Sequence, residues 1–368
     1  MHGPFALDAC QVPVFRYALE RWPADAYGLA VFHNGPLSKE QQEIIASVDY
    51  DVNLEVFTID VSEMTAPQRI RFGKVEVRKG QALARLYYPV ESRQGDDALW
   101  EGTLNRQALD RIVDSPVRRK IAKDILAGES AVWVILKSGD PESDALVETN
   151  LNKHLQAISK WLEIPEGVAG PGELERVASG EVAMEDVLRS TIPLKISFSA
   201  VSISRNDPEE AMFVRMLTGF VPDLIERYPG QPLVFPVFGR GRTLDGISQE
   251  MLNDELMASA GSYICGACSC EVKRENPGID LVMSVEWDEA LEGSAVVVDK
   301  QLPPLEGVGD LVVSVAQIDP SAVSDEASDE PDVQRDESVS IIGVMGILCA
   351  VILIVLTGMT FLLKRRAA

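Results

Sequence analysis

The sequence predicts an α/β protein made of two units and followed by a C-terminal transmembrane helix. Short apolar runs of strand length alternate with helical patterns along most of the chain, which is typical of α/β layering. The same helix-capping sequence recurs after two of the predicted strands. Close to the C-terminus, residues 339–363 include no charged side chain. Together these three observations predict the two α/β units and the membrane span.

Residues 1–164 form the first predicted unit, which begins with an N-terminal arm. Ser38 is predicted to cap a helix, because a serine hydroxyl accepts a free N–H group of the first helical turn. Ser115 and Pro116 open a further helix, and Gly128 lies just past its end. The predicted strands of this unit are Gly28–Phe32, Leu54–Ile59, Leu83–Tyr88, Ala98–Leu104 and Ala131–Leu136.

The recurring capping sequence is Asp-Pro-Glu, at residues 140–142 and 207–209. The first copy follows the predicted strand 131–136 and the second follows the predicted strand 195–203. Aspartate accepts backbone N–H groups, proline fits the first turn, and glutamate is favoured by the helix dipole. The recurrence suggests two similar α/β units, separated by a Gly/Pro-rich linker and a short helical insert at residues 165–193.

Residues 194–316 form the second predicted unit, which holds most of the cysteines outside the span. Residues 232–238 and 279–287 are predicted strands, and Ser248–Ser259 is a predicted helix. After the strand 232–238 comes a loop with two glycines and two arginines: Gly239, Arg240, Gly241 and Arg242.

This glycine–arginine loop is a candidate ligand-binding site. Glycines let a ligand approach backbone amides, and arginines donate paired hydrogen bonds to a carboxylate or phosphate. Ligands of open α/β sheets also gather beyond the carboxyl ends of strands. His33 has an equivalent position after the strand Gly28–Phe32. The alternative is a solvated loop that forms salt bridges, with His33 as a turn residue.

Four cysteines lie outside the predicted span: Cys10 and the cluster Cys265, Cys268 and Cys270. Cys265 and Cys268 have the C-x-x-C spacing of redox pairs, but they follow a predicted helix instead of preceding one. A metal site built from four thiolates is another alternative, although no second C-x-x-C supports it. Structural disulfides are the interpretation favoured for an exported domain. We also expect Cys10 to adjoin the cluster in the fold.

Residues 339–363 are long enough, at about 1.5 Å per residue, to span a bilayer core of about 30 Å. An acidic spacer at residues 317–338 precedes the span, and a basic tail at residues 364–368 follows it. This asymmetry predicts a cytoplasmic tail and an extracytoplasmic N-terminal region. The first residues lack the pattern of an export signal. We therefore expect either a start further upstream or, as the alternative, a tail-anchored protein that faces the cytoplasm.

The formal net charge of −23 at pH 7 argues against nucleic acid as a partner, since phosphates would be repelled. Cationic partners are compatible with it. The chain shows no nucleophile–base pair, so no catalytic residue is predicted. No cofactor is expected, apart from the metal considered for the cysteines. The sequence thus predicts a membrane-anchored binding or scaffold protein with a protein partner. A thiol-redox or metal-binding protein is the alternative.

Three stretches resemble segments of uncharacterised single-span bacterial envelope proteins: Phe15–Leu37, Val234–Arg242 and Cys265–Leu281. The predicted units also resemble thioredoxin-like modules that lack the redox cysteines. In place of those cysteines stand Asn34-Gly35 and Arg205-Asn206. The resemblance implies an exported protein and no known activity.

Overall fold

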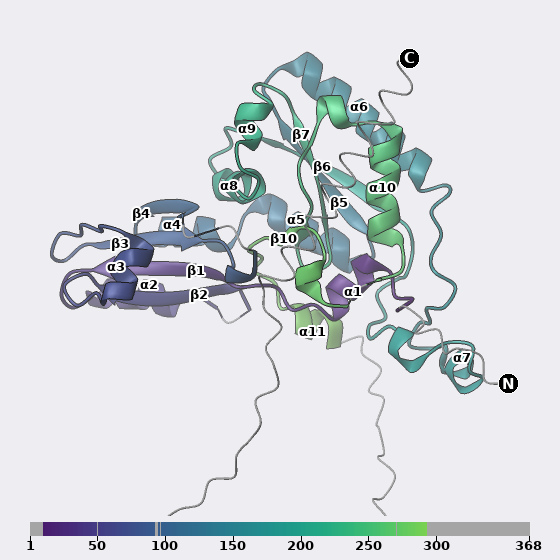
Figure 1. Cartoon of the computed structure of the whole chain (residues 1–368), viewed down its shortest axis with the longest axis horizontal. Coiled ribbons are helices and arrows are strands. Elements are labelled where there is room, and N and C mark those ends of the chain that lie inside the picture. Colours follow the sequence, from purple (N-terminus) through teal and green to yellow (C-terminus); the bar gives the residue numbers. More distant parts are fainter. Residues whose placement is uncertain (1–9, 50, 93–94, 96, 270, 293–368) are drawn as a thin grey trace, which may run out of the picture. The chain divides into compact units, whose positions relative to one another are not determined.

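The structure is a computed structural model that describes residues 10–49, 51–92, 95, 97–269 and 271–292. Two β-sheets with flanking helices make up this region (Figure 1), which confirms the mixed α/β class. The predicted spacer, span and tail, at residues 317–338, 339–363 and 364–368, lie outside the described residues. Within the described ranges, no helix has both the length and the apolar character needed to cross a bilayer.

The first sheet has the strand order β2-β1-β3-β4. Strands β1 and β2 are parallel, and β3 is antiparallel to both β1 and β4. An N-terminal helix, α1, precedes this sheet. The elements are α1 (Val14–Glu20), β1 (Tyr27–His33), α2 (Lys39–Ala46), β2 (Leu54–Asp60), α3 (Ala66–Phe72), β3 (Ala82–Tyr87), a 3₁₀ turn (Val90–Ser92), β4 (Trp100–Thr103), α4 (Arg106–Val113) and α5 (Pro116–Leu126).

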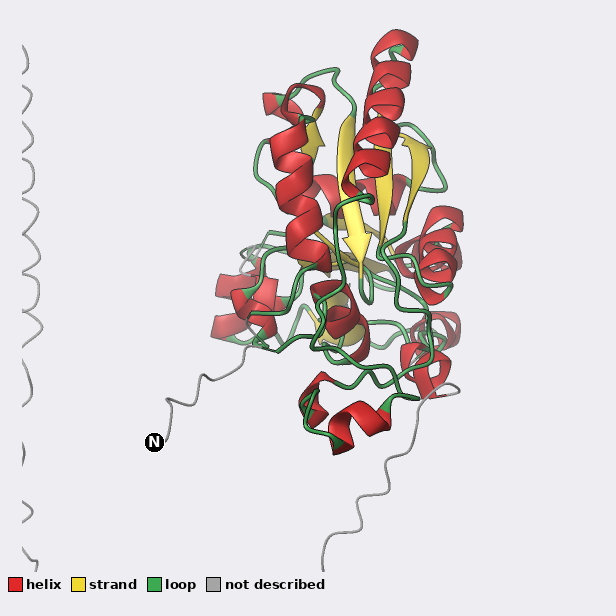
Figure 2. Cartoon of the chain, turned by 90° about the vertical axis from the view of Figure 1, so that its right-hand side faces the viewer, coloured by secondary structure: helices red, strands yellow, loops and turns green. Residues whose placement is uncertain are grey.

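The second sheet has the strand order β10-β8-β7-β5-β6, and β9 pairs with β7. Helices lie on both sides of its strands (Figure 2). The elements are β5 (Ala131–Lys137), α6 (Pro141–Ile158), α7 (Leu174–Ala178), β6 (Phe198–Ser204), α8 (Ala211–Gly219), α9 (Leu224–Arg227), β7 (Leu233–Phe238), β8 (Arg242–Thr243), β9 (Ile247–Ser248), α10 (Asp254–Cys265), β10 (Ile279–Asp280), α11 (Trp287–Glu292) and 3₁₀ turns at Met184–Asp186, Gln249–Met251 and Lys273–Glu275.

The two sheets repeat one topology. Strands β5 and β6 are parallel, and β7 is antiparallel to both β5 and β8. The strands β5 to β8 therefore correspond in order and direction to β1 to β4. A short sequence repeat accompanies this match, since Gly80-Gln81 precedes β3 and Gly230-Gln231 precedes β7. Both glycines have positive φ, at 83° and 68°, so each turn uses a conformation that favours glycine.

The change from one sheet to the other comes earlier in the chain than the predicted linker at residues 165–193. Strand β5 lies within the predicted first unit, residues 1–164, yet it pairs with β6 and β7 of the second sheet. The linker and insert instead lie between α6 and β6. Both Asp-Pro-Glu sequences therefore follow strands of the second sheet. A capping sequence marks the start of a helix, but it does not show to which sheet the preceding strand belongs.

One hydrophobic core cluster contains residues of both sheets. Leu29 and Val31 of the first sheet belong to it together with Val134 and Phe235 of the second. Because successive strand residues point to opposite faces, the other face of each sheet contributes to a separate cluster. The described residues therefore form one compact folded unit, in which the two sheets share one core cluster and each packs its other face in a second cluster.

Several predicted helix starts are confirmed. The Ser38 and Asp140 side chains accept N–H groups at the first turns of α2 and α6. Asp207 is not the cap of α8, whose cap residue is Glu210. The predicted strand at residues 279–287 is present only as β10, and α11 begins at Trp287. Its alternating pattern comes instead from a buried irregular segment that includes Leu281, Val282 and Met283.

Candidate functional site

The glycines of the predicted glycine–arginine loop form a tight turn between β7 and β8. Gly239 and Gly241 have φ values of 58° and 97°. A Cβ atom at Gly239 would lie 2.5 Å from the Ala18 Cβ, and one at Gly241 would lie 2.6 Å from the Met283 Cγ. Both glycines are thus explained by the packing of the turn on neighbouring segments.

Arg242 is buried and its guanidinium is fully engaged by the protein. It donates to the carbonyl oxygens of Pro277 and Asn276, at 3.0 and 2.8 Å, and to Asp280 Oδ1 at 3.1 Å. Its guanidinium also lies 5.7 Å from the centre of the Trp22 ring. These contacts connect β8 to the segment around β10, so Arg242 has a structural role.

Arg240 joins three separate segments of the chain. Its Nε donates to the Leu19 carbonyl at 2.8 Å, and a terminal nitrogen donates to Asp288 Oδ1 at 2.6 Å. The turn is thereby attached to α1 on one side and to α11 on the other. Arg240 also lines a pocket, so the predicted loop does reach a candidate site.

His33 ends β1 and stabilises the turn that follows it. Its Nδ1 donates to the Gly35 carbonyl at 2.7 Å, because a carbonyl can only accept. Nδ1 also lies 3.8 Å from Asp60 Oδ2, and that oxygen accepts the Gly35 N–H at 3.1 Å. His33 and Arg240 are not brought together in one site, because His33 is not among the residues that line the pocket of Arg240.

The described cysteines lie where the N-terminal arm meets the end of α10. Pro13 pairs with Ala267 in an antiparallel bridge, and the Cys268 N–H donates to the Val12 carbonyl at 3.0 Å. Cys10, Cys265 and Cys268 belong to one core cluster, and the arm that carries Cys10 pairs with the residues beside Cys268, which agrees with the expectation that Cys10 adjoins the cluster. These three cysteines are unbridged thiols in the structure, and Cys270 lies outside the described residues.

Burial makes two of these thiols poor nucleophiles. It raises the pKa of Cys10 to about 11 and that of Cys265 to about 12. A reactive cysteine needs the opposite shift, because the thiolate is the nucleophile. Within the described residues, no group of three His, Cys, Asp or Glu side chains is arranged to hold a metal ion.

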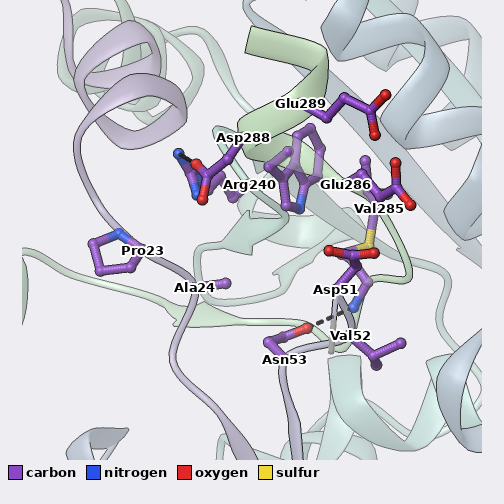
Figure 3. Close-up of a pocket in the computed structure, with 12 residues that line it drawn as sticks. Pro23, Ala24, Asp51, Val52, Asn53, Arg240, Val285, Glu286, Asp288 and Glu289 are labelled. Atoms are coloured by element: carbon purple, nitrogen blue, oxygen red, sulfur yellow. Dashed lines mark hydrogen bonds and ion pairs between the residues drawn. The ribbon is translucent and has the colours of Figure 1, made fainter. Parts of the chain in front are cut away.

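The pocket lined by Arg240 is the candidate site (Figure 3). It has a volume of about 390 Å³ and lies between the segment after α1, the segment before β2, the β7–β8 turn and the start of α11. Its charged lining is mainly acidic. The lining residues are Pro23, Ala24, Asp51, Val52, Asn53, Arg240, Met283, Val285, Glu286, Trp287, Asp288 and Glu289.

Three carboxylates of the pocket are close to one another. Hydrogen bonding with Glu289 and then with Asp51 raises the pKa of Glu286 to about 7, since a shared proton relieves the repulsion. The Oδ2 atom of Asp51 is buried without a hydrogen-bond partner in the described residues. Figure 3 shows these carboxylates apart from the pair that Asp288 makes with Arg240.

The pocket also holds a hydrogen-bond donor without an acceptor. Trp287 is 5% exposed, and among the described residues its indole N–H has no partner. A buried indole N–H normally finds an acceptor. The pocket therefore combines three neighbouring carboxylates with one free donor.

The sequence predicted only Arg240 among the residues that line this pocket. Asp51 lies far from Glu286 along the chain, and only the fold brings them together. The run Glu286-Trp287-Asp288-Glu289, with its three acidic residues, was a visible signal, but its first two residues fell in a predicted strand. Searches against protein-family models and against curated proteins found no match to this chain.

Proposed function

We propose that this chain is a membrane-anchored, extracytoplasmic binding protein that carries out no thiol–disulfide chemistry. The observation that carries the proposal is the position of the cysteines. Those among the described residues lie in the arm and at or just after the C-terminal end of α10, and the turns that follow the first strand of each sheet contain none.

The repeated topology supports two thioredoxin-like units. When β1–β4 and β5–β8 are each numbered 1 to 4 along the chain, both sets lie in the order 4-3-1-2. Strands 1 and 2 form a parallel pair, and strands 3 and 4 are then added in antiparallel pairings. In such modules a redox pair lies between the first strand and its helix. The corresponding residues here are His33-Asn34-Gly35 after β1 and Lys137-Ser138-Gly139 after β5. The sequence alone predicts the second of these positions at Arg205-Asn206. That pair follows β6, which is the second strand of its sheet and not the first.

Membrane anchoring rests on the sequence of residues 339–363 and on the charges that flank it. The acidic spacer at residues 317–338 would hold the folded unit away from the bilayer by self-repulsion. A folded unit anchored in this way is suited to holding a protein partner near the membrane. The acidic pocket offers a place for such a partner.

The alternative function is thiol redox or metal binding through Cys265, Cys268, Cys270 and Cys10. One observation favours keeping it: the arm and the end of α10 are paired, so several sulfurs lie in one region. The raised pKa values of Cys10 and Cys265 count against the redox version.

The test is an assay on the purified full chain in detergent. The rate at which dithiothreitol reduces a protein disulfide should be the same with and without the chain. Bound metal should be well below one equivalent by elemental analysis. Catalysis that a Cys265→Ala variant abolishes, or one equivalent of metal lost from that variant, would contradict the proposal.

A further inference from the structure

We infer that the acidic pocket beside α11 binds the basic side chain of a protein partner and that the Trp287 N–H donates to a carbonyl oxygen of that partner. This inference rests on the proposed binding function and names the chemistry of the partner.

The charges of the pocket lining are unbalanced. Arg240 is the one basic residue in this lining, and Asp288 already pairs with it at 2.6 Å. Among the described residues, the other three carboxylates of this lining, those of Asp51, Glu286 and Glu289, form no ion pair with a cation. Clustered carboxylates repel, and a nearby positive charge removes that repulsion. The site therefore favours a cationic ligand.

The unsatisfied indole N–H of Trp287 favours a ligand that also carries an acceptor. Trp287 is almost completely buried, and its donor is unsatisfied in the described residues. A metal ion has no lone pair to offer such a donor. A peptide that bears a basic side chain supplies both the cation and a backbone carbonyl.

Size is consistent with the same ligand. A volume of about 390 Å³ falls in the usual range for small-ligand pockets, so the site has room for one long side chain and its peptide unit. Arginine would donate to two carboxylates at once through its planar group. The rest of the pocket is fixed by structural contacts, since the Asn53 side chain accepts the Met283 N–H at 2.9 Å.

The probe is N-acetyl-arginine N-methylamide, added to the full chain at low ionic strength. The chain contains five tryptophans, so labelling their indole nitrogens with ¹⁵N gives five resolvable signals, and a Trp287→Phe variant assigns one of them. We expect a saturable shift of the Trp287 signal. The uncharged isostere, N-acetyl-citrulline N-methylamide, should produce no shift.

Glu286→Gln should weaken binding of the arginine probe at least about fivefold, since one charge-assisted contact is lost. Glu185→Gln is the matched control, because Glu185 is exposed and lies outside the pocket. The other four indole signals report whether each variant is folded.

Equal binding of the citrulline probe, or unchanged affinity in Glu286→Gln, would overturn the inference. A Trp287 shift caused by calcium chloride and not by the arginine probe would also overturn it in favour of a metal site. The proposed function and the pocket assignment can fail independently. If the chain catalyses disulfide reduction and also binds the arginine probe, the proposed function is contradicted and the pocket assignment stands.

Discussion

A terminal guanidinium nitrogen of Arg240 lies 2.6 Å from Asp288 Oδ1, which joins the β7–β8 turn to α11. The same arginine donates to the Leu19 carbonyl in α1. Three segments that are distant in the sequence therefore meet at one side chain. The pocket beside α11 depends on that junction, because Arg240 and Asp288 form part of its lining.

The turn that presents Arg240 should not tolerate a side chain at its first glycine. Gly239→Ala places a methyl group 2.5 Å from the Ala18 Cβ in a left-handed conformation, so we expect a loss of roughly 2–4 kcal/mol in unfolding free energy. Urea unfolding measures this loss.

Gly139→Ala is the matched control, since Gly139 has φ 96° but open space around its Cβ position. It should lose only about 1–2 kcal/mol, the cost of the conformation alone. Equal losses for the two variants would show that the close contact with Ala18 does not constrain the turn.

Arg242 should be needed for stability and not for ligand binding. Arg242→Met leaves two carbonyls and Asp280 without this donor, so we expect a loss of about 3–5 kcal/mol in unfolding free energy. Arg274→Met, at an exposed arginine, should change it by less than about 0.5 kcal/mol. A small loss for Arg242→Met would exclude the structural role.

The pKa of Glu286 gives a pH dependence with a definite sign. Its pKa in the folded state is raised from 4.5 to about 7, so the folded chain binds more protons than the unfolded chain between these values. This carboxyl therefore lowers stability as pH rises from about 4.5 to 7.

Glu286→Gln should remove that contribution. Its melting temperature should exceed that of the parent chain at pH 8 and match it near pH 4. Because the two chains differ only at residue 286, the difference between their melting temperatures reports Glu286 and not the many other carboxylates. A difference that does not change with pH would mean that Glu286, Glu289 and Asp51 do not share a proton.

Membrane topology can be tested with a reporter that is active only outside the cytoplasm. Fused before Ser338 in a chain that carries an added export signal, it should be active. Reporter silence would favour the tail-anchored alternative.

Local patterns predicted the elements of the fold well. The apolar runs at residues 28–32, 54–59 and 131–136 lie in β1, β2 and β5, and Ser38 caps α2 as expected. Sheet membership was harder to predict, because an apolar run does not identify the strand with which it pairs. The Gly-Gln repeat before β3 and β7 was the available signal for the repeated topology.

The site was only partly predictable, because long-range contacts create it. Arg240 looked like a ligand-binding residue, yet its partners Leu19 and Asp288 could not be identified from spacing. The C-x-x-C spacing of Cys265 and Cys268 suggested chemistry, but their burial depends on the docked arm.

The reactivity of the native thiols tests the central claim most directly. Iodoacetamide should leave Cys10, Cys265 and Cys268 of the reduced, folded chain unmodified at pH 7, because they are buried and because the pKa values of Cys10 and Cys265 are raised. Urea should make all three reactive, as mass spectrometry of the peptides would show. Alkylation of any of them in the folded chain at pH 7, as fast as a free thiol or faster, would contradict the account.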